Sequence, residues 1–295
     1  MTRRHGRLST HAIAAAILLF TGGPVLLALY GSLVPDRILL DPAVSVFDVG
    51  PSLESYRYIF TGELPASYLV EGANRSMISD AARQVPQSLW NSTRIALGSM
   101  LLNILLGAPA AYMFARHAFP GKRVTFLFII LSPLVPTTAL VVPIYLVMQG
   151  AGLVGTQSGI ILVHTAQALP FTILILSVFF RRLPAELFEA AVLDRCTGLQ
   201  SFLRIAVPLA LPSIGATGLF AFMLSYSEYV FSLVLSGEAR SRPVSVVMAA
   251  LARNTDVSWS LLNAGIFLAL IPTLLLVVLV WRFVVEGILS GSVKG

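Results

Sequence analysis

The sequence predicts an all-α membrane protein with six transmembrane helices. Of its 295 residues, 56% are hydrophobic and only 12% are charged, which is about half the charged fraction of a typical soluble domain. The mean hydropathy of the chain is +0.84. Several apolar stretches also have the roughly twenty residues that an α-helix needs to cross the hydrocarbon core of a bilayer. Together these observations favour a bundle of spans over a water-soluble core.

Six stretches of the chain are long and apolar enough to span. Three are almost purely apolar and cover residues 11–33, 125–148 and 261–285. Three hold more polar residues and cover residues 94–115, 158–180 and 213–236. We interpret the first as an uncleaved span, because its apolar core is long for a signal peptide and no small-residue cleavage pattern follows it. We therefore expect one transmembrane domain over residues 1–295.

The distribution of basic residues indicates the side of the membrane on which each loop lies. We assign residues 36–93 and 237–260 to the outside and residues 181–212 to the cytoplasm. Lys and Arg then concentrate in cytoplasmic segments, as they do in most inner-membrane proteins. An even number of spans places both termini on the same side, and the basic residues put that side in the cytoplasm. The pI near 9.8 thus reflects membrane orientation, and the scattered charges form no single basic patch for nucleic acid.

The first outer loop, residues 36–93, is the longest segment outside the predicted spans. At under about sixty residues, and broken by prolines, it is too short for a core of its own. Residues 52–60 predict a short amphipathic helix with Leu53, Tyr56 and Ile59-Phe60 on one face. Residues 75–90 are a candidate for another helix. We expect the loop to pack on the outer ends of the spans.

The cytoplasmic segment 181–212 is polar and helix-forming. Pro184 suits the first turn of a helix, Glu189 follows in that helix, and Gly198 fits its C-terminus. A second short helix is expected over residues 199–206, after which Pro208 and Pro212 turn the chain back to the fifth span. The segment then projects as a helix pair. An amphipathic element lying on the lipid surface is the alternative. Cys196, the only cysteine, is expected to be a reduced packing residue.

The same segment carries a motif. Glu189-Ala190-Ala191, Asp194, Gly198 and Pro208 to Pro212 resemble the coupling-loop signature of ABC importer permeases. Further landmarks resemble the carbohydrate-uptake branch, in particular its maltose-type second permease. They are Asn91-Ser92, Ala111-Tyr112, Phe119 to Arg123, Pro170-Phe171 and Gly291 to Gly295. The resemblance implies the type I importer permease fold, with a cytoplasmic coupling-helix loop.

Two positions depart from the family pattern. The family usually has Gly directly after the Asp of the motif, whereas this chain has Arg195. In the fifth span the family commonly has Trp-Asn-Glu/Asp-Phe, and this chain has Tyr226-Ser227-Glu228-Tyr229. The acid is kept and its neighbours are changed.

The resemblance implies a set of partners. They are a second permease subunit, two ATP-binding subunits and an external substrate-binding protein. ATP and Mg²⁺ would bind to the ATP-binding subunits, since this chain has no phosphate-binding loop motif; no cofactor is expected in the chain itself. The residues expected to couple to the ATPase are Glu189, Ala190, Ala191, Asp194, Gly198 and Pro208. Glu189 is the candidate for a charged contact with an ATPase arginine.

The last outer loop is the candidate contact with the binding protein. By resemblance, Glu238, Arg240 and Arg242 would reach into that protein and help to expel its sugar. A merely solvated loop is the alternative.

Polar residues inside the spans are candidates for the substrate path. They are Glu228, Tyr229, Tyr226, Gln167, His164 and Asn103. Glu228 is the only acid placed inside a span, and ionisable groups at that depth are usually functional; the alternative is a charge solvated at the interface or paired with a neighbouring subunit. Amides and hydroxyls suit sugar hydroxyls, and aromatic faces can stack on a sugar ring. Hydrogen bonds between spans use the same residue types, and this structural role is the alternative for each.

The predicted function is therefore import of a sugar or sugar derivative through an ABC permease. An ABC permease for a non-sugar solute is an alternative. A stand-alone secondary transporter would need a relay of several intramembrane ionisable groups. An intramembrane metalloenzyme would need clustered His, Cys or carboxylates, but the four histidines are scattered. We expect no catalytic residue and no metal site.

Overall fold

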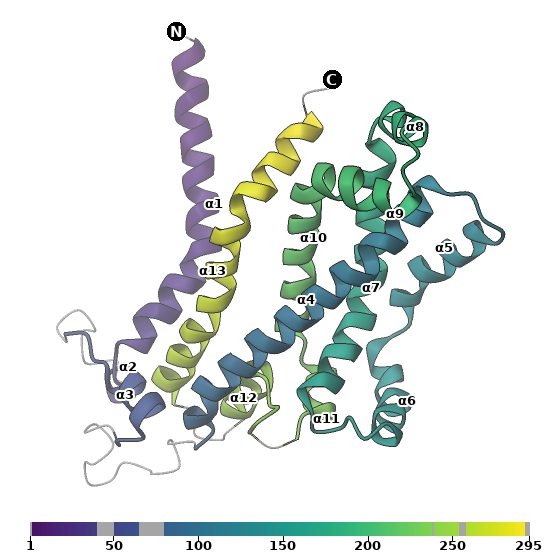
Figure 1. The fold of residues 1–295 in the computed structure, drawn as a ribbon. Helices are drawn as coiled ribbons and strands as arrows, with labels where there is room; N and C mark the ends of the chain where they lie inside the picture. The colour runs from purple at the N-terminus through teal and green to yellow at the C-terminus, as the bar shows by residue number, and fades with distance from the viewer. Residues whose placement is uncertain (1, 40–49, 65–79, 238, 254–257, 293–295) are drawn as a thin grey trace. The chain divides into compact units, whose positions relative to one another are not determined.

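The computed structural model describes residues 2–39, 50–64, 80–237, 239–253 and 258–292, and these residues form helices and loops without a strand (Figure 1). The long helices are α1 (Thr2–Ser32), α4 (Val85–Arg116), α7 (Gln157–Arg182), α10 (Val207–Ser227) and α13 (Trp259–Ser292). The shorter ones are α2 (Asp36–Leu39), α3 (Glu54–Thr61), η4 (Asp80–Gln84), α5 (Lys122–Leu131), η5 (Ser132–Leu134), α6 (Thr137–Gly150), α8 (Ala185–Leu193), α9 (Gly198–Ser201), η6 (Phe202–Ala206), α11 (Val230–Leu235) and α12 (Val244–Ala252).

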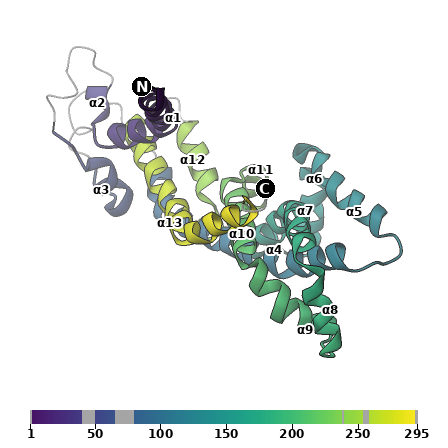
Figure 2. The same ribbon diagram turned by 90° about the horizontal axis from the view of Figure 1, so that it is seen from above.

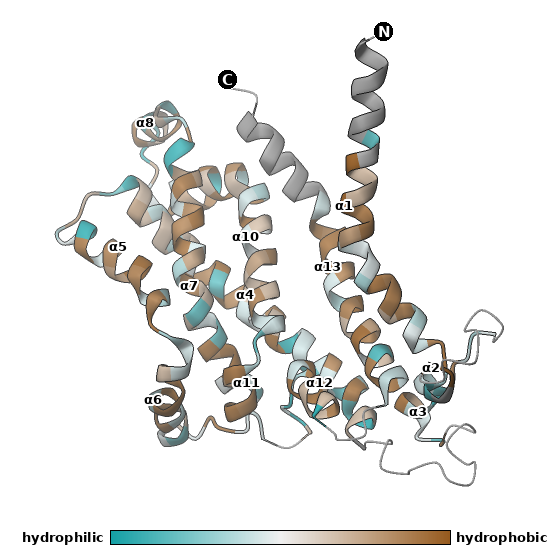
Figure 3. Ribbon diagram, turned by 180° about the vertical axis from the view of Figure 1, so that it is seen from behind, coloured by the Kyte–Doolittle hydropathy of each residue, from teal (hydrophilic) through white to brown (hydrophobic). Residues whose placement is uncertain are grey.

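Five helical stretches among the described residues are long and apolar enough to cross a membrane, and a bent pair of helices makes a sixth. The prediction of an all-α membrane fold with six spans is thereby confirmed. Hydrophobic residues predominate along these spans (Figure 3). In the first span, Ile13–Ser32, almost the whole surface is uncovered, and Phe20 is 85% exposed. An apolar helix of this kind needs lipid or another protein around it.

The third span, predicted over residues 125–148, is bent. Its two halves, Lys122–Leu134 and Thr137–Gly150, meet at 104°. Val135 between them is extended, with φ −69° and ψ 123°. A residue before proline is sterically pushed out of the helical region, and Pro136 follows Val135. The prolines at this point therefore break the span, whereas Pro109 and Pro170 lie within unbroken helices.

The fifth span also differs from its predicted bounds of 213–236. Its helix already begins at Gly198 and runs to Ser227, so that Pro208 and Pro212 lie within a helical stretch and not in a connecting loop. The π-helical turn Phe202–Ala206 precedes Pro208 and shifts the hydrogen-bond register before a residue that has no N–H to donate. At the other end, Glu228 is extended (ψ 130°), and a separate helix, α11, begins at Val230.

Within the single transmembrane domain expected over residues 1–295, the chain falls into two compact units. The first comprises the residues up to Leu89 together with Val247–Ile271. Its core lies between α3, η4, the start of α4, α12 and α13, and includes Tyr58, Val85, Val247 and Leu261. The carboxylate of the buried Asp36 accepts hydrogen bonds from the Ser258 hydroxyl and from the Ser260 backbone N–H, which fixes α2 to the start of α13.

The first outer loop contributes two elements to this unit. The predicted amphipathic helix is present as α3, but Leu53 and Phe60 are 66% and 61% exposed, while Tyr58 and Ile59 are buried. The face predicted from the sequence was therefore wrong in part, because the core contacts this helix from the side of Tyr58. Of the second candidate helix, residues 80–90 are helical as η4 and the start of α4; residues 75–79 lie outside the described residues.

The second unit comprises Trp90–Val246 together with Pro272–Gly295. Helices α4, α7 and α10 pack closely in it, because small residues stand where they cross. A Cβ on Gly107 of α4 would lie 2.5 Å from Thr172 Cγ2 of α7, and one on Gly218 of α10 would lie 2.8 Å from Ile104 Cδ1 of α4. Small residues at crossings are the usual means of close packing between spans. Helices α5–α6 and α8–α9 extend from α7 in different directions (Figure 2).

Candidate functional site

Helices α8 and α9 form an elbow at one end of α7 and α10 (Figure 1). Pro184 is the N-cap of α8, as its missing N–H permits. Thr197 begins α9 with a capping box, in which its hydroxyl accepts from Gln200 N–H and the Gln200 side chain accepts from Thr197 N–H. The elbow predicted at residues 181–212 is thus a pair of helices with well-defined ends.

The turn between the two helices is centred on Arg195. This is the only non-glycine residue with a positive φ (55°) among the described residues. Arg195 N–H donates to Val192 O and Cys196 N–H donates to Ala191 O, the pair of bonds that closes a helix in a Schellman motif. The helix therefore ends at Asp194-Arg195, and Gly198, predicted as its C-terminus, is instead the first residue of α9. An arginine occupies the left-handed position that favours glycine.

The tip of the elbow exposes both polar and apolar side chains. Glu189, Ala190, Asp194 and Gly198 are exposed. Val192, Leu193 and Leu199 are 71%, 84% and 66% exposed, although the tip is otherwise polar. Exposed apolar clusters of this kind mark surfaces that contact a partner or a membrane. Of the six predicted coupling residues, Ala191 is buried and packs the elbow internally. Pro208 lies in the first turn of α10 and is exposed.

Aromatic packing fixes the base of the elbow to the spans. Phe188 of α8 and Phe202 of η6 both approach the ring of Tyr112 in α4, at 6.1 and 5.2 Å between centroids. Tyr112 and Phe202 belong to a core that α4, α7, η6 and α10 share. Close-packed rings thus join α8 to α4 and to the start of the fifth span.

Arg116 adds a second attachment, which the sequence did not single out. Its guanidinium lies 4.3 Å from the centre of the Phe188 ring, within cation–π range, and it also donates to the Leu183 carbonyl. The signal in the sequence was a basic residue directly after the apolar part of the second span. Nothing in that pattern showed that it would stack on α8.

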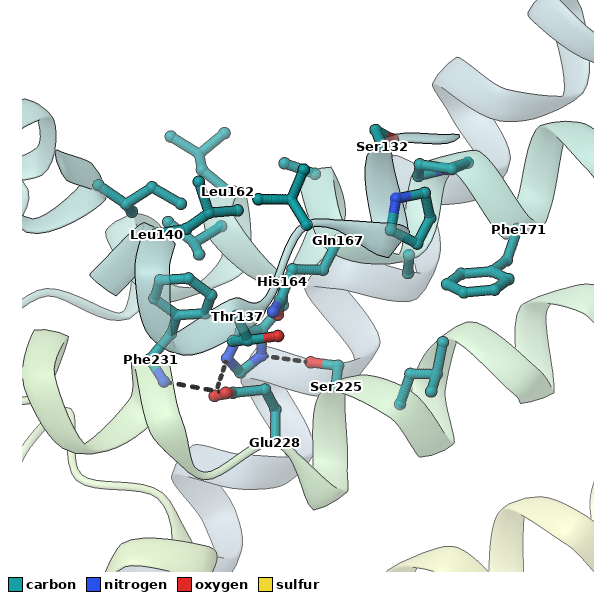
Figure 4. Close-up of a pocket in the computed structure, with 18 of the residues that line it drawn as sticks. Ser132, Thr137, Leu140, Leu162, His164, Gln167, Phe171, Ser225, Glu228 and Phe231 are labelled. Carbon is teal, nitrogen blue, oxygen red and sulfur yellow. Dashed lines mark hydrogen bonds and ion pairs between the residues drawn. The ribbon is translucent and has the colours of Figure 1, made fainter. Parts of the chain in front are cut away.

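A cavity of about 540 Å³ lies in the second unit between the bent third span, α7, the end of α10 and α11 (Figure 4). Its wall is mostly apolar and includes Leu140, Leu162, Phe171 and Phe231. Three of the six predicted substrate-path residues line it, namely His164, Gln167 and Glu228. Volume and lining are those of a small-molecule site, which is typically an apolar concavity with a few placed polar groups.

His164 and Glu228 form a buried polar network at the floor of the cavity. His164 Nε2 lies 3.0 Å from Glu228 Oε2, and His164 Nδ1 lies 2.8 Å from Ser225 Oγ (Figure 4). The Glu228 carboxylate also accepts from the backbone N–H groups of Phe231 and Ser232, each at 2.9 Å. These N–H groups begin α11, so the carboxylate caps that helix. The network holds the break between α10 and α11 against α7.

The other predicted path residues do not line this cavity. Asn103 is fully buried, and its amide oxygen accepts from the Thr172 hydroxyl, a hydrogen bond between α4 and α7. Tyr226 stacks on Phe222 at 5.5 Å. Tyr229 is the N-cap residue of α11. Of the six predicted path residues, Asn103, Tyr226 and Tyr229 therefore lie outside the lining of the cavity.

The loop between α11 and α12 is held by side chains from the cavity end of α4 and α7. Asn91 donates to the carbonyls of Ala239 and Arg242. Gln157 donates to Asn91 Oδ1 and to the Arg240 carbonyl. The Arg240 side chain is exposed, whereas the Arg242 guanidinium bonds to Gly237 O within the loop. Glu238 lies outside the described residues.

Comparison with known proteins identifies the family. Residues 103–289 match the model of the binding-protein-dependent transport system inner membrane component family. The matched segment includes the elbow, the cavity and the network at its floor. The match covers more than half of the chain.

Individual relatives agree with the family match. The chain is 31% identical over 294 residues to the trehalose transport system permease protein SugB of Mycobacterium tuberculosis, covering 98% of this chain and 96% of that protein. It is 34% identical over 209 residues to the osmoprotective compounds uptake permease protein GgtD of Synechocystis, covering 70% of each.

The fold matches a solved structure as well. A chain in the crystal structure of a bacterial ABC transporter involved in the import of the acidic polysaccharide alginate superposes with a TM-score of 0.72, covering 96% of this chain and 98% of that chain at 18% identity. This likeness concerns the fold. Members of the family are transport subunits of the inner membrane that work with an ATPase and a binding protein. The chain belongs to the family of binding-protein-dependent transport system inner membrane components, the multi-pass permease subunits of ABC importers.

Proposed function

We propose that this chain is a permease subunit of a sugar importer, and that its substrate is a neutral disaccharide or glycoside, with trehalose as the first candidate. The observation that carries the proposal is the 31% identity to a trehalose permease protein over 98% of the chain, because a match of that extent includes every span and loop. We infer that the subunit pairs with a second permease and with two ATP-binding subunits. ATP and Mg²⁺ bind to those subunits.

The α8–α9 elbow is the proposed docking element for the ATPase. Its apolar tip, Val192, Leu193 and Leu199, has no cover within the described residues and would be buried in a cleft of the partner. Glu189 stands beside it, exposed and available to an ATPase arginine. Closure of the ATPase would push on α8, and the rings of Phe188 and Tyr112 would pass the movement to the spans. An interface with two packed arrangements gives such rigid-body coupling.

The proposed orientation follows from the docking. ATP is hydrolysed in the cytoplasm, so the elbow lies there, and six spans then place both termini on the same side. The α11–α12 loop, at the other end of α7, lies outside and meets the binding protein. Arg240 is the contact best supported, because its side chain is exposed on a loop that Asn91 and Gln157 hold in place. Arg242 acts by keeping the loop in shape.

The experiment is uptake of labelled trehalose by proteoliposomes that contain the complete importer, with its binding protein outside and ATP inside. We expect uptake to depend on both. Uptake that persists without ATP but collapses with an ionophore would identify a secondary transporter and overturn the proposal.

A charge reversal at the elbow tests the docking contact. Glu189→Lys is expected to abolish uptake with normal amounts of protein in the membrane, because a cation would face the proposed arginine. Glu186→Lys is the matched control, since Glu186 is exposed on the same helix one turn earlier, and it should retain most uptake. Unchanged uptake by Glu189→Lys would remove Glu189 from the interface.

A further inference from the structure

The cavity between the bent third span and α7 is a candidate for a ligand site in this subunit. Hydrogen bonds within the protein determine which polar groups of the cavity can still bind a ligand. Among the described residues, His164 and Glu228 are the only ionisable ones that line it, and they bond to each other and to Ser225, Phe231 and Ser232. Their polar atoms are therefore committed to the protein. A charged ligand would find no unpaired countercharge in this wall.

Two other polar side chains line the cavity and have no hydrogen-bond partner in the described part of the chain. They are Gln167 of α7 and Thr137 at the start of α6, both half-buried. Gln167 brings two N–H donors and one carbonyl acceptor into a mostly apolar space. Leaving such groups unpaired away from water is costly. The wall therefore offers unpaired hydrogen-bond donors and acceptors that suit a neutral molecule with hydroxyl groups (Figure 4).

An aromatic face stands next to the free amide. Phe171 follows Gln167 by four residues, and side chains at that spacing lie on the same face of a helix. Its ring is 36% exposed, lines the cavity, and is held edge-on by Phe220, with 6.0 Å between ring centroids. The C–H face of a sugar ring packs on such a surface while its hydroxyls bond to the amide. The cavity volume of about 540 Å³ is within the usual range for small-molecule sites.

We infer that Gln167, Thr137 and Phe171 form a binding subsite for a neutral sugar ring in this subunit, and that His164 and Glu228 hold its floor in place without contacting the sugar. This inference rests on the proposed function, since it names where the imported sugar is held. It also divides the predicted substrate-path residues into one contact, Gln167, and two positioning residues.

Site-directed labelling tests the subsite, because Cys196 is the only cysteine in the chain. In a Cys196→Ser background, Ala166→Cys places a thiol on the cavity wall, and Ala139→Cys places one on an exposed part of α6 that does not line it. A thiol reagent is applied to the complete importer with ATP and binding protein, with or without trehalose. We expect trehalose to slow labelling of Ala166→Cys several-fold and to leave Ala139→Cys unchanged.

Each other outcome overturns the assignment. Labelling of Ala166→Cys that ignores trehalose shows that the sugar passes elsewhere, and the proposed function stands if uptake persists. Absence of labelling in both conditions shows that another subunit fills the cavity. Equal slowing at both positions shows a general conformational change. If the wild-type importer takes up no trehalose, the proposed function fails first and the subsite with it.

Uptake kinetics supply the second readout. Gln167→Leu is expected to raise the KM of trehalose uptake about five-fold, the equivalent of one neutral hydrogen bond. Gln149→Leu, at the exposed end of α6, is the control and should leave KM unchanged. An unaltered KM in Gln167→Leu would contradict the contact.

Discussion

The two ends of α7 are stabilised by opposite means. At the end near Arg182, rings from α4, α8 and η6 pack around Tyr112, and apolar side chains at the elbow tip stay uncovered. At the end near Gln157, amides, hydroxyls and a carboxylate bond to backbone groups of α11 and the loop after it. The apolar end leaves Val192, Leu193 and Leu199 uncovered among the described residues, whereas the polar groups at the other end bond to backbone groups of the chain itself. We propose that the first end docks to a partner and that the second holds a shape.

The largest effect is expected from a polar residue at the elbow tip. Leu193→Asp should reduce uptake at least about tenfold, because a desolvated charge costs more than 1.4 kcal/mol at an interface. Leu193 is 84% exposed, so folding of the subunit should be unaffected. The measurement is co-purification of the ATPase with the permease, together with uptake. Normal assembly of Leu193→Asp would show that the tip faces lipid or water.

Glu228→Ala tests the other end of α7, near Gln157. There the expected effect is a loss of stability of the folded protein. Removing the carboxylate leaves His164 and two helix-end N–H groups without their partner, which should lower the free energy of unfolding by about 3 kcal/mol. Glu228→Gln keeps one carbonyl acceptor and should lose less. Thermal unfolding of the purified importer in detergent measures both. A Glu228→Ala variant that unfolds like the wild type but no longer transports would instead make Glu228 a substrate contact.

The smallest expected effect is at Arg195. Glycine adopts the left-handed conformation without the strain that a Cβ brings, so Arg195→Gly should stabilise the α8–α9 turn by roughly 1 kcal/mol. Arg195→Ala keeps the Cβ and removes the charge, and it is the matched control. Hydrogen exchange of the Cys196 amide, which closes the turn, reports the local stability. Faster exchange in Arg195→Gly than in the wild type would mean that the arginine side chain supports the turn.

What the sequence predicted correctly has local causes. Apolar length predicted the six spans, and Pro184 with Glu189 predicted a helix within residues 181–212. Breaks in helices were less accessible. The break at Val135 follows from Pro136, which a count of apolar residues does not register, whereas no proline follows Glu228 to mark the break there.

Contacts between residues that are far apart in the chain could not be predicted from the sequence. His164 and Glu228 are 64 residues apart, and no pattern in either span pairs them; the prediction could only name both as polar residues at membrane depth. The positive φ of Arg195 was missed for a different reason. Glycine is the usual signal for that conformation, and the turn forms here without it, so that the sequence points to the nearest glycine, Gly198, instead.

The most direct test of the account is a cross-link from the elbow tip. Leu193→Cys in a Cys196→Ser background provides a single thiol at the tip, to which a photoreactive group can be attached in the assembled importer. We predict that illumination joins the permease to the ATP-binding subunit and that the yield changes when ATP is bound. Cross-links to lipid alone, in complexes that still hydrolyse ATP, would contradict the account.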